Sequence, residues 1–141
     1  MGQINVGRML LGGLVAGVVV NVGETLLNGV FLMDQWTAAR EALNAGPEPA
    51  SALAYYVVYG FLVGLVMVAL YASIRPRFGP GAKTAAIAGL FVWTASCLGF
   101  AVLNLASGLY PQGLVWTGAV GELVLFPVAA VVGAMVYRED G

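Results

Sequence analysis

Three polar side chains interrupt the first long apolar run of this 141-residue chain: Asn21, Glu24 and Asn28. Their spacing of i, i+3 and i+7 places them on one face of an α-helix. A carboxyl group in such a segment is costly unless a partner receives it, so a chain keeps one there chiefly for a site or a helix contact. The chemistry on offer is proton transfer, cation binding or hydrogen bonding between helices.

A second carboxyl group, Glu122, lies in the last apolar run. Each glutamate is about nine residues below the outer end of its run, which is ~13 Å deep at a rise of 1.5 Å per residue. The first and last helices of a four-helix bundle are neighbours, so we expect Glu24 and Glu122 to face each other. The candidate groups around this pair are Asn21, Asn28, Asn104, Thr25, Tyr59 and Thr117.

No lysine or arginine lies within an apolar run to neutralise the pair, unless Arg40 reaches down to it. The carboxyl groups are then both protonated, share one proton or hold a cation. We expect one of the first two states, because carboxyl and amide side chains satisfy each other between helices. Three roles remain open: a structural contact between helices, a proton or cation site, or two independent glutamates near the lipid interface.

The sequence contains no histidine and one cysteine. Histidine is the usual protein ligand of haem and zinc and the commonest general base. Cys97 lies in an apolar run without a disulfide or CxxC partner, and we interpret it as a small buried hydrophobe. The Glu-x-x-His motifs of di-iron bundles are absent. We therefore expect a non-enzymatic protein with no metal site and no cofactor.

Composition identifies the solvent as lipid, because 60% of the residues are apolar and only 9% are charged, against about 25% charged in soluble domains. Four apolar runs cover residues 8–33, 51–74, 83–108 and 113–137. Each is long enough to cross ~30 Å of hydrocarbon, where only helices satisfy their backbone at this length. We predict one all-α domain, an integral membrane four-helix bundle in up-down-up-down order, with no basic stripe for nucleic acid.

The basic residues predict the orientation of these helices. Five of the six lie before the first run, between the second and third, or after the fourth: Arg8, Arg75, Arg77, Lys83 and Arg138. This bias predicts that both termini and the middle loop are cytoplasmic, in a multi-pass protein of the bacterial inner membrane. We expect Arg75, Arg77 and Lys83 to contact anionic lipid headgroups.

The first outer loop predicts a short interfacial helix over residues 34–45. Asp34 can cap its start, and Gly46-Pro47 can stop it. We interpret Trp36 as an anchor in the aromatic belt at the membrane surface. The functional alternative is a lid over the polar face of the first helix.

Glycines of the first two runs are spaced for close helix packing. Gly13 and Gly17 continue the polar face of the first helix, and Gly60 and Gly64 form a Gly-xxx-Gly pair in the second. Such residues let two backbones approach closely. A stripe of this kind suits a bundle interior and a subunit interface equally well.

The Gly-rich first run, Trp36 just past its outer end and the segment 115–122 (VWTGAVGE) resemble small bacterial membrane protein families of unknown function. The resemblance covers the four-helix plan. It implies a bacterial inner-membrane protein and transfers no functional residue.

The first hypothesis is a non-enzymatic structural or accessory subunit that packs against other transmembrane helices, in a homo- or hetero-oligomer surrounded by membrane lipids. The alternative is a small transporter or channel in which Glu24 and Glu122 pass protons or a cation. A third is a membrane protein that binds a hydrophobic ligand or pigment. Convergence of the polar residues on a cavity open to one side would favour transport, and complete packing would favour the subunit.

Overall fold

A computed structural model of the chain describes residues 3–139, and its elements there are all helical. Four helices are long and apolar enough to cross a membrane: Val6–Phe31, Ala52–Phe78, Ala82–Ser107 and Gln112–Val136. The four predicted apolar helices are therefore confirmed, with ends that differ by a few residues from the sequence boundaries. A fifth, short helix, α2 (Met33–Ala42), follows the first span.

Two of the spans contain a π-helical turn. The first span consists of α1 (Val6–Leu26) and η1 (Leu27–Phe31), and the third of α4 (Ala82–Trp93), η2 (Thr94–Leu98) and α5 (Gly99–Ser107). In η1 the N–H of Leu32 donates to the carbonyl of Leu27 at 2.8 Å, and in η2 the N–H of Gly99 donates to the carbonyl of Thr94. Such i to i+5 turns redirect the side chains around them and are frequent at functional sites.

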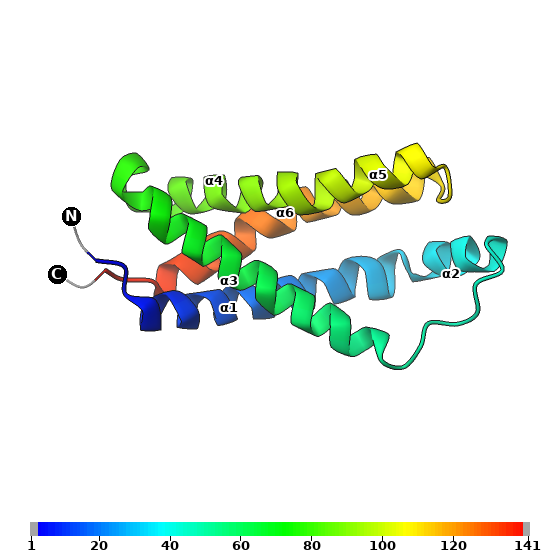
Figure 1. Cartoon of the computed structure of the whole chain (residues 1–141), viewed down its shortest axis with the longest axis horizontal. Coiled ribbons are helices and arrows are strands. Elements are labelled where there is room, and N and C mark those ends of the chain that lie inside the picture. Colours follow the sequence, from blue (N-terminus) through cyan, green and yellow to red (C-terminus); the bar gives the residue numbers. More distant parts are fainter. Residues whose placement is uncertain (1–2, 140–141) are drawn as a thin grey trace.

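Successive spans run in alternating directions along the long axis, and α3 (Ala52–Phe78) crosses α1 obliquely (Figure 1). The helix α6 (Gln112–Val136) packs against both α1 and α4. The described ends of the chain lie at one end of the molecule, here called the terminal end, and α2 lies at the other, the α2 end (Figure 1). The first and last spans are thus neighbours, as a carboxyl pair between them requires.

The four glycines predicted for helix packing lie where α1 meets α3. A methyl group on Gly17 would lie 2.9 Å from the Cα of Phe61, and one on Gly13 would lie 2.8 Å from the Cα of Leu65. A methyl group on Gly64 would overlap the backbone of Gly17. This glycine stripe therefore faces a helix of the same chain, because the two backbones touch there.

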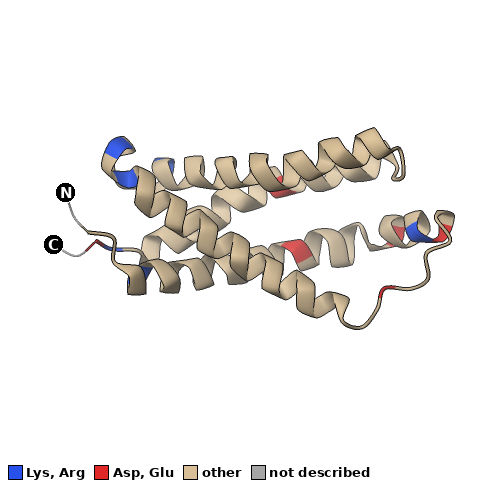
Figure 2. Ribbon diagram, viewed as in Figure 1, with Lys and Arg blue, Asp and Glu red and all other residues tan. Residues whose placement is uncertain are grey.

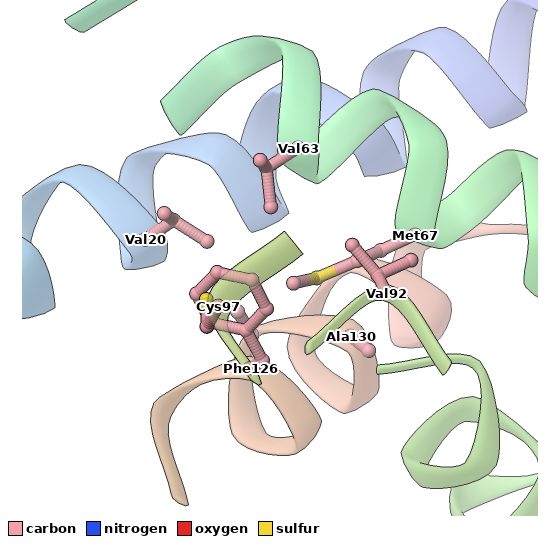
Figure 3. Close-up of a cluster of buried hydrophobic side chains, with 8 residues drawn as sticks. Val20, Val63, Met67, Val92, Cys97, Phe126 and Ala130 are labelled. Carbon is pink, nitrogen blue, oxygen red and sulfur yellow. The ribbon is translucent and has the colours of Figure 1, made fainter. Parts of the chain in front are cut away.

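A cluster of buried apolar side chains, here called the apolar layer, lies between the helices of the bundle (Figure 3). Val20, Met67 and Phe126 are fully buried in this layer. Val63 and Cys97 also belong to it and are slightly exposed. Phe126 lies one helical turn from Glu122, on the side of the terminal end. The bundle is therefore closed by packed side chains between the glutamate level and the terminal end.

The bundle is more open at the α2 end. There α5 packs against α6, and most residues in the first two turns of α3 are exposed. Leu53 is 68% exposed and Tyr55 is 74% exposed on this part of α3. A shallow, mainly apolar groove of about 660 Å³ lies along the third span, and all of its lining residues, from Thr94 to Leu103, belong to that span.

Charged residues lie mainly at the two ends of the molecule (Figure 2). Arg75 pairs with Glu139 at 3.1 Å, and its guanidinium lies 5.6 Å from the centroid of the Tyr137 ring. Arg75 thus has a partner within the chain, and its contact with lipid headgroups stays a prediction. Arg77 and Lys83 are exposed, and their contact with lipid headgroups stays a prediction.

Candidate intramembrane carboxyl site

Each of the four spans contributes a polar side chain to one cluster, here called the carboxyl site. Its members are Glu24 of α1, Tyr59 of α3, Cys97 of η2 and Glu122 of α6, which interact electrostatically with one another. In Figure 2 the acidic positions within α1 and α6 lie at a similar level along the long axis. The structure therefore brings the two predicted glutamates and Tyr59 together.

The Glu24 carboxyl group has one satisfied oxygen and one without a partner. The side-chain amide of Asn28 donates to Glu24 Oε2 at 2.6 Å, across one turn of helix. Oε1 is buried and has no hydrogen-bond partner among the described residues. Because an unsatisfied buried oxygen is costly, this atom is the point of the site at which a proton or a cation would be stabilised.

Glu122 is bound from the third span. The thiol of Cys97 interacts with its carboxyl group. The indole N–H of Trp93 donates to the carbonyl of Ala119 at 2.9 Å, which ties the same span to α6. Cys97 is buried in the apolar layer, as its sequence context indicated, but its sulfur also has a polar role that the sequence interpretation missed.

Tyr59 links the site to Ser96 of the third span. Its hydroxyl interacts with the side chain of Ser96, whose own hydroxyl donates to the carbonyl of Val92 at 2.7 Å and lies 3.6 Å from the Cys97 sulfur. Ser96 also lines the groove, so its side chain lies between the groove and Cys97.

Asn21 lies one turn away from this site and joins two helices. Its side-chain amide donates to the carbonyl of Gly17 at 3.0 Å and to the carbonyl of Val57 at 3.2 Å. The amide lies where a Cβ on Gly60 would be, at 2.6 Å. Asn21 therefore acts as a contact between α1 and α3, on the predicted polar face but outside the carboxyl cluster.

We expect Asn21→Ala to lower the free energy of unfolding by about 1 kcal/mol, the size of a hydrogen bond between transmembrane helices. Thermal unfolding in detergent measures the effect. Thr94→Ala is the matched control, because the Thr94 hydroxyl donates only to Leu90 of its own helix. Equal losses in the two variants would show that the bond to Val57 contributes nothing.

Two further sequence candidates lie elsewhere. The Asn104 amide donates to the carbonyl of Phe100 at 2.8 Å, within its own helix, so the structure does not bring it to the carboxyl site. Arg40 donates to the carbonyl of Gly46 through Nε and Nη2, at 3.1 and 2.6 Å. Its guanidinium is engaged in the loop and does not neutralise the glutamates.

Sequence reasoning missed Ser96 and Cys97 as members of the polar cluster. The depth of Cys97 in the membrane could have identified it, because Cys97 and Glu122 lie equally far from the ends of their spans at the α2 end. The same rule that paired the two glutamates would have selected Cys97. Cys97 was not among the predicted site residues because its apolar context indicated a buried hydrophobe.

The fold and composition define the class: this is a multi-pass α-helical membrane protein whose four apolar helices form one bundle. Comparisons with protein-family models, with curated proteins and with solved structures find no match.

Proposed function

We propose that the protein is a small non-enzymatic transporter or channel that passes protons or singly charged cations through the carboxyl site. The observation that carries this proposal is the convergence of all four spans on Glu24 and Glu122, with Glu24 Oε1 buried and unpartnered. A purely structural contact would satisfy both oxygens. An incomplete hydrogen-bond set is instead what a site leaves for its occupant.

The surroundings of the site support closure on one side. The apolar layer around Phe126 and Met67 lies between the site and the terminal end, whereas Tyr59 and Ser96 are polar neighbours of the site. Closure toward one side matches one of the two states between which an alternating-access transporter moves.

The proposal is limited to protons and singly charged cations because of the ligands present. Among residues 3–139 no group of three or more His, Cys, Asp and Glu side chains could hold a metal ion. Glu24, Glu122 and Cys97 do not form such a group either, so a proton is the first occupant proposed for the carboxyl pair and a monovalent cation the second. Intramembrane carboxyl groups commonly form proton relays.

Flux through proteoliposomes tests this function. We expect the purified chain to carry protons or a monovalent cation down an imposed potential, measured with an internal pH dye and by exchanging Na⁺ for K⁺. The double variant Glu24→Gln with Glu122→Gln should abolish this flux, because an amide neither releases a proton nor neutralises a cation. Its melting temperature should change little, since glutamine keeps an oxygen that accepts hydrogen bonds.

Glu41→Gln is the matched control, because it makes the same chemical change on an exposed position of α2. It should leave the flux unchanged. Wild-type vesicles that leak no faster than empty ones, or an unchanged flux in the double variant, would rule out the proposed function.

A second candidate function is that of an accessory subunit packed against another membrane helix. It is favoured by the exposed part of α3 near the α2 end, where Leu53, Tyr55 and Val58 are 68%, 74% and 56% exposed. A photoreactive amino acid at position 55, activated in native membranes, would then form a defined protein adduct. Adducts with lipid alone would contradict the accessory-subunit function.

We also propose that the protein lies in a bacterial inner membrane with both termini cytoplasmic and α2 at the outer surface. Supporting this, the terminal end carries Arg8 at the start of α1, Arg75 and Arg77 at the end of α3, and Lys83 at the start of α4. Among residues 3–139, Arg40 is the one basic residue at the α2 end. This distribution matches the excess of basic residues on cytoplasmic loops.

A further inference from the structure

A hydrogen-bonded chain connects the short helix α2 to the buried carboxyl group. The indole N–H of Trp36 donates to Asn28 Oδ1 at 3.0 Å, and Asn28 Nδ2 donates to Glu24 Oε2 at 2.6 Å. Asn28 lies in the π turn η1, which separates α1 from α2. Trp36 is half-buried, so the chain runs from the α2 end into the bundle.

This chain has one direction only. An indole N–H is a donor and never an acceptor, so Asn28 must present its oxygen to Trp36. The amide NH₂ of Asn28 must then face Glu24, and Glu24 Oε2 must accept. While the chain is intact a proton on Glu24 is therefore favoured on Oε1, because the unprotonated oxygen of a carboxyl group is the better acceptor for the Asn28 amide.

We infer that Trp36 and Asn28 are positioning residues that reserve Glu24 Oε1 for the proton or cation and couple its occupancy to α2. The inference rests on the proposed function, because it assigns roles around the same carboxyl group. Oε1 is the oxygen that the structure leaves buried and unpartnered. Trp36 thus acts on the site through Asn28, without touching the occupant.

The coupling follows from the charge on the acceptor. A hydrogen bond to a carboxylate is roughly twice as strong as one to a neutral oxygen. The hydrogen bond from Asn28 to Glu24 is therefore stronger when Glu24 is charged, and Asn28 and Trp36 are then more firmly fixed. A proton or cation at Oε1 weakens this hydrogen bond.

The contacts of Trp36 transmit this change in hydrogen-bond strength to the α2 end. The Trp36 ring meets the edge of Tyr110 at 5.7 Å between centroids, at the connection before α6. Leu32, Ala39 and Leu114 form a buried cluster against both rings. A change in the hold on Trp36 therefore reaches both α2 and the start of α6.

The indole N–H signal of Trp36 in a ¹⁵N-labelled chain tests this inference directly, with Trp36→Phe used to assign it. Glu24→Leu removes the acceptor of the Asn28 amide, so Asn28 is no longer held in place for Trp36. We therefore expect exchange of the Trp36 indole hydrogen with solvent to become about tenfold faster. Asn28→Leu should do the same. Glu24→Gln should restore most of the protection, because its amide oxygen still accepts from Asn28.

Two controls separate a positioning role from general loosening. The indole signal of Trp93, which bonds Ala119 on α6, should not move in Glu24→Leu. Exchange of the Trp36 signal in Glu41→Leu should equal that of the wild type. Unchanged exchange at Trp36 in Glu24→Leu, or equal loss at Trp93, overturns the coupling.

Flux measurements on Trp36→Phe complete the test. This variant keeps the aromatic contact with Tyr110 but loses the N–H, so we expect an altered cation or proton affinity with flux still present. An affinity equal to that of the wild type overturns the positioning role. Absence of flux in the wild type would instead refute the proposed function, whereas the indole exchange would still decide whether the chain of bonds couples Glu24 to α2.

Discussion

Gly64→Ala is expected to destabilise the bundle by about 1–3 kcal/mol, the cost of forcing an added methyl group into a packed interface. The added methyl group would lie 2.6 Å from the Cα of Gly17 and 2.5 Å from the carbonyl oxygen of Gly13. Because these are backbone atoms, no side chain can rotate to make room, and α1 and α3 must separate. The melting temperature in detergent should fall by roughly 3–10 °C.

Gly118→Ala is the matched control for this variant. Gly118 also lies inside a span, and a methyl group there would meet no atom within 4 Å. It should be neutral or slightly stabilising, because alanine is the better helix former by about 1 kcal/mol. Equal melting temperatures for the two variants would contradict the close contact between α1 and α3.

Phe126→Ala is expected to have two effects, one on stability and one on flux. Phe126 is fully buried in the apolar layer, so its truncation leaves a cavity. We expect a loss of about 3 kcal/mol, at the low end for buried aromatic residues, because separated helices in lipid still surround the ring with apolar groups. On the proposed function, the same cavity should let water pass the layer and raise the proton leak of proteoliposomes.

Phe100→Ala controls for the loss of a phenyl ring as such, because Phe100 is 65% exposed on the groove side of the third span. It should change neither the melting temperature nor the leak by much. A Phe126→Ala variant that melts earlier but leaks no faster would show that the layer only stabilises the bundle and does not close a path.

The sequence predicted the spans well because hydrophobic length alone decides whether a helix crosses a membrane. It also placed Asn21, Glu24 and Asn28 on one helical face, since that depends only on the helical repeat. The sequence did not show that these side chains have different hydrogen-bond partners. Asn21 meets the carbonyl of Val57 on α3, while Asn28 binds Glu24 within its own helix.

The missed members of the carboxyl site have a common cause. A depth rule says how far a residue lies along its span but not which way its side chain points. The turn η2 redirects the third span at Thr94–Leu98, and this rotation determines that Cys97 meets Glu122 while Asn104 stays within its own helix. A π turn of this kind has no sequence signature that hydropathy records.

The amino-acid sequence by itself determined a membrane-spanning helical bundle, the level of its two carboxyl groups and the glycines that allow close packing. Only the tertiary structure decided that the glycines face α3 of the same chain, that a polar residue comes from every span, and that Trp36 reaches Glu24 through Asn28. The physical reason is that composition and period fix what a helix buries and how deep it lies. The rotation of each helix about its axis is set by packing against its neighbours, and that rotation selects which polar groups meet.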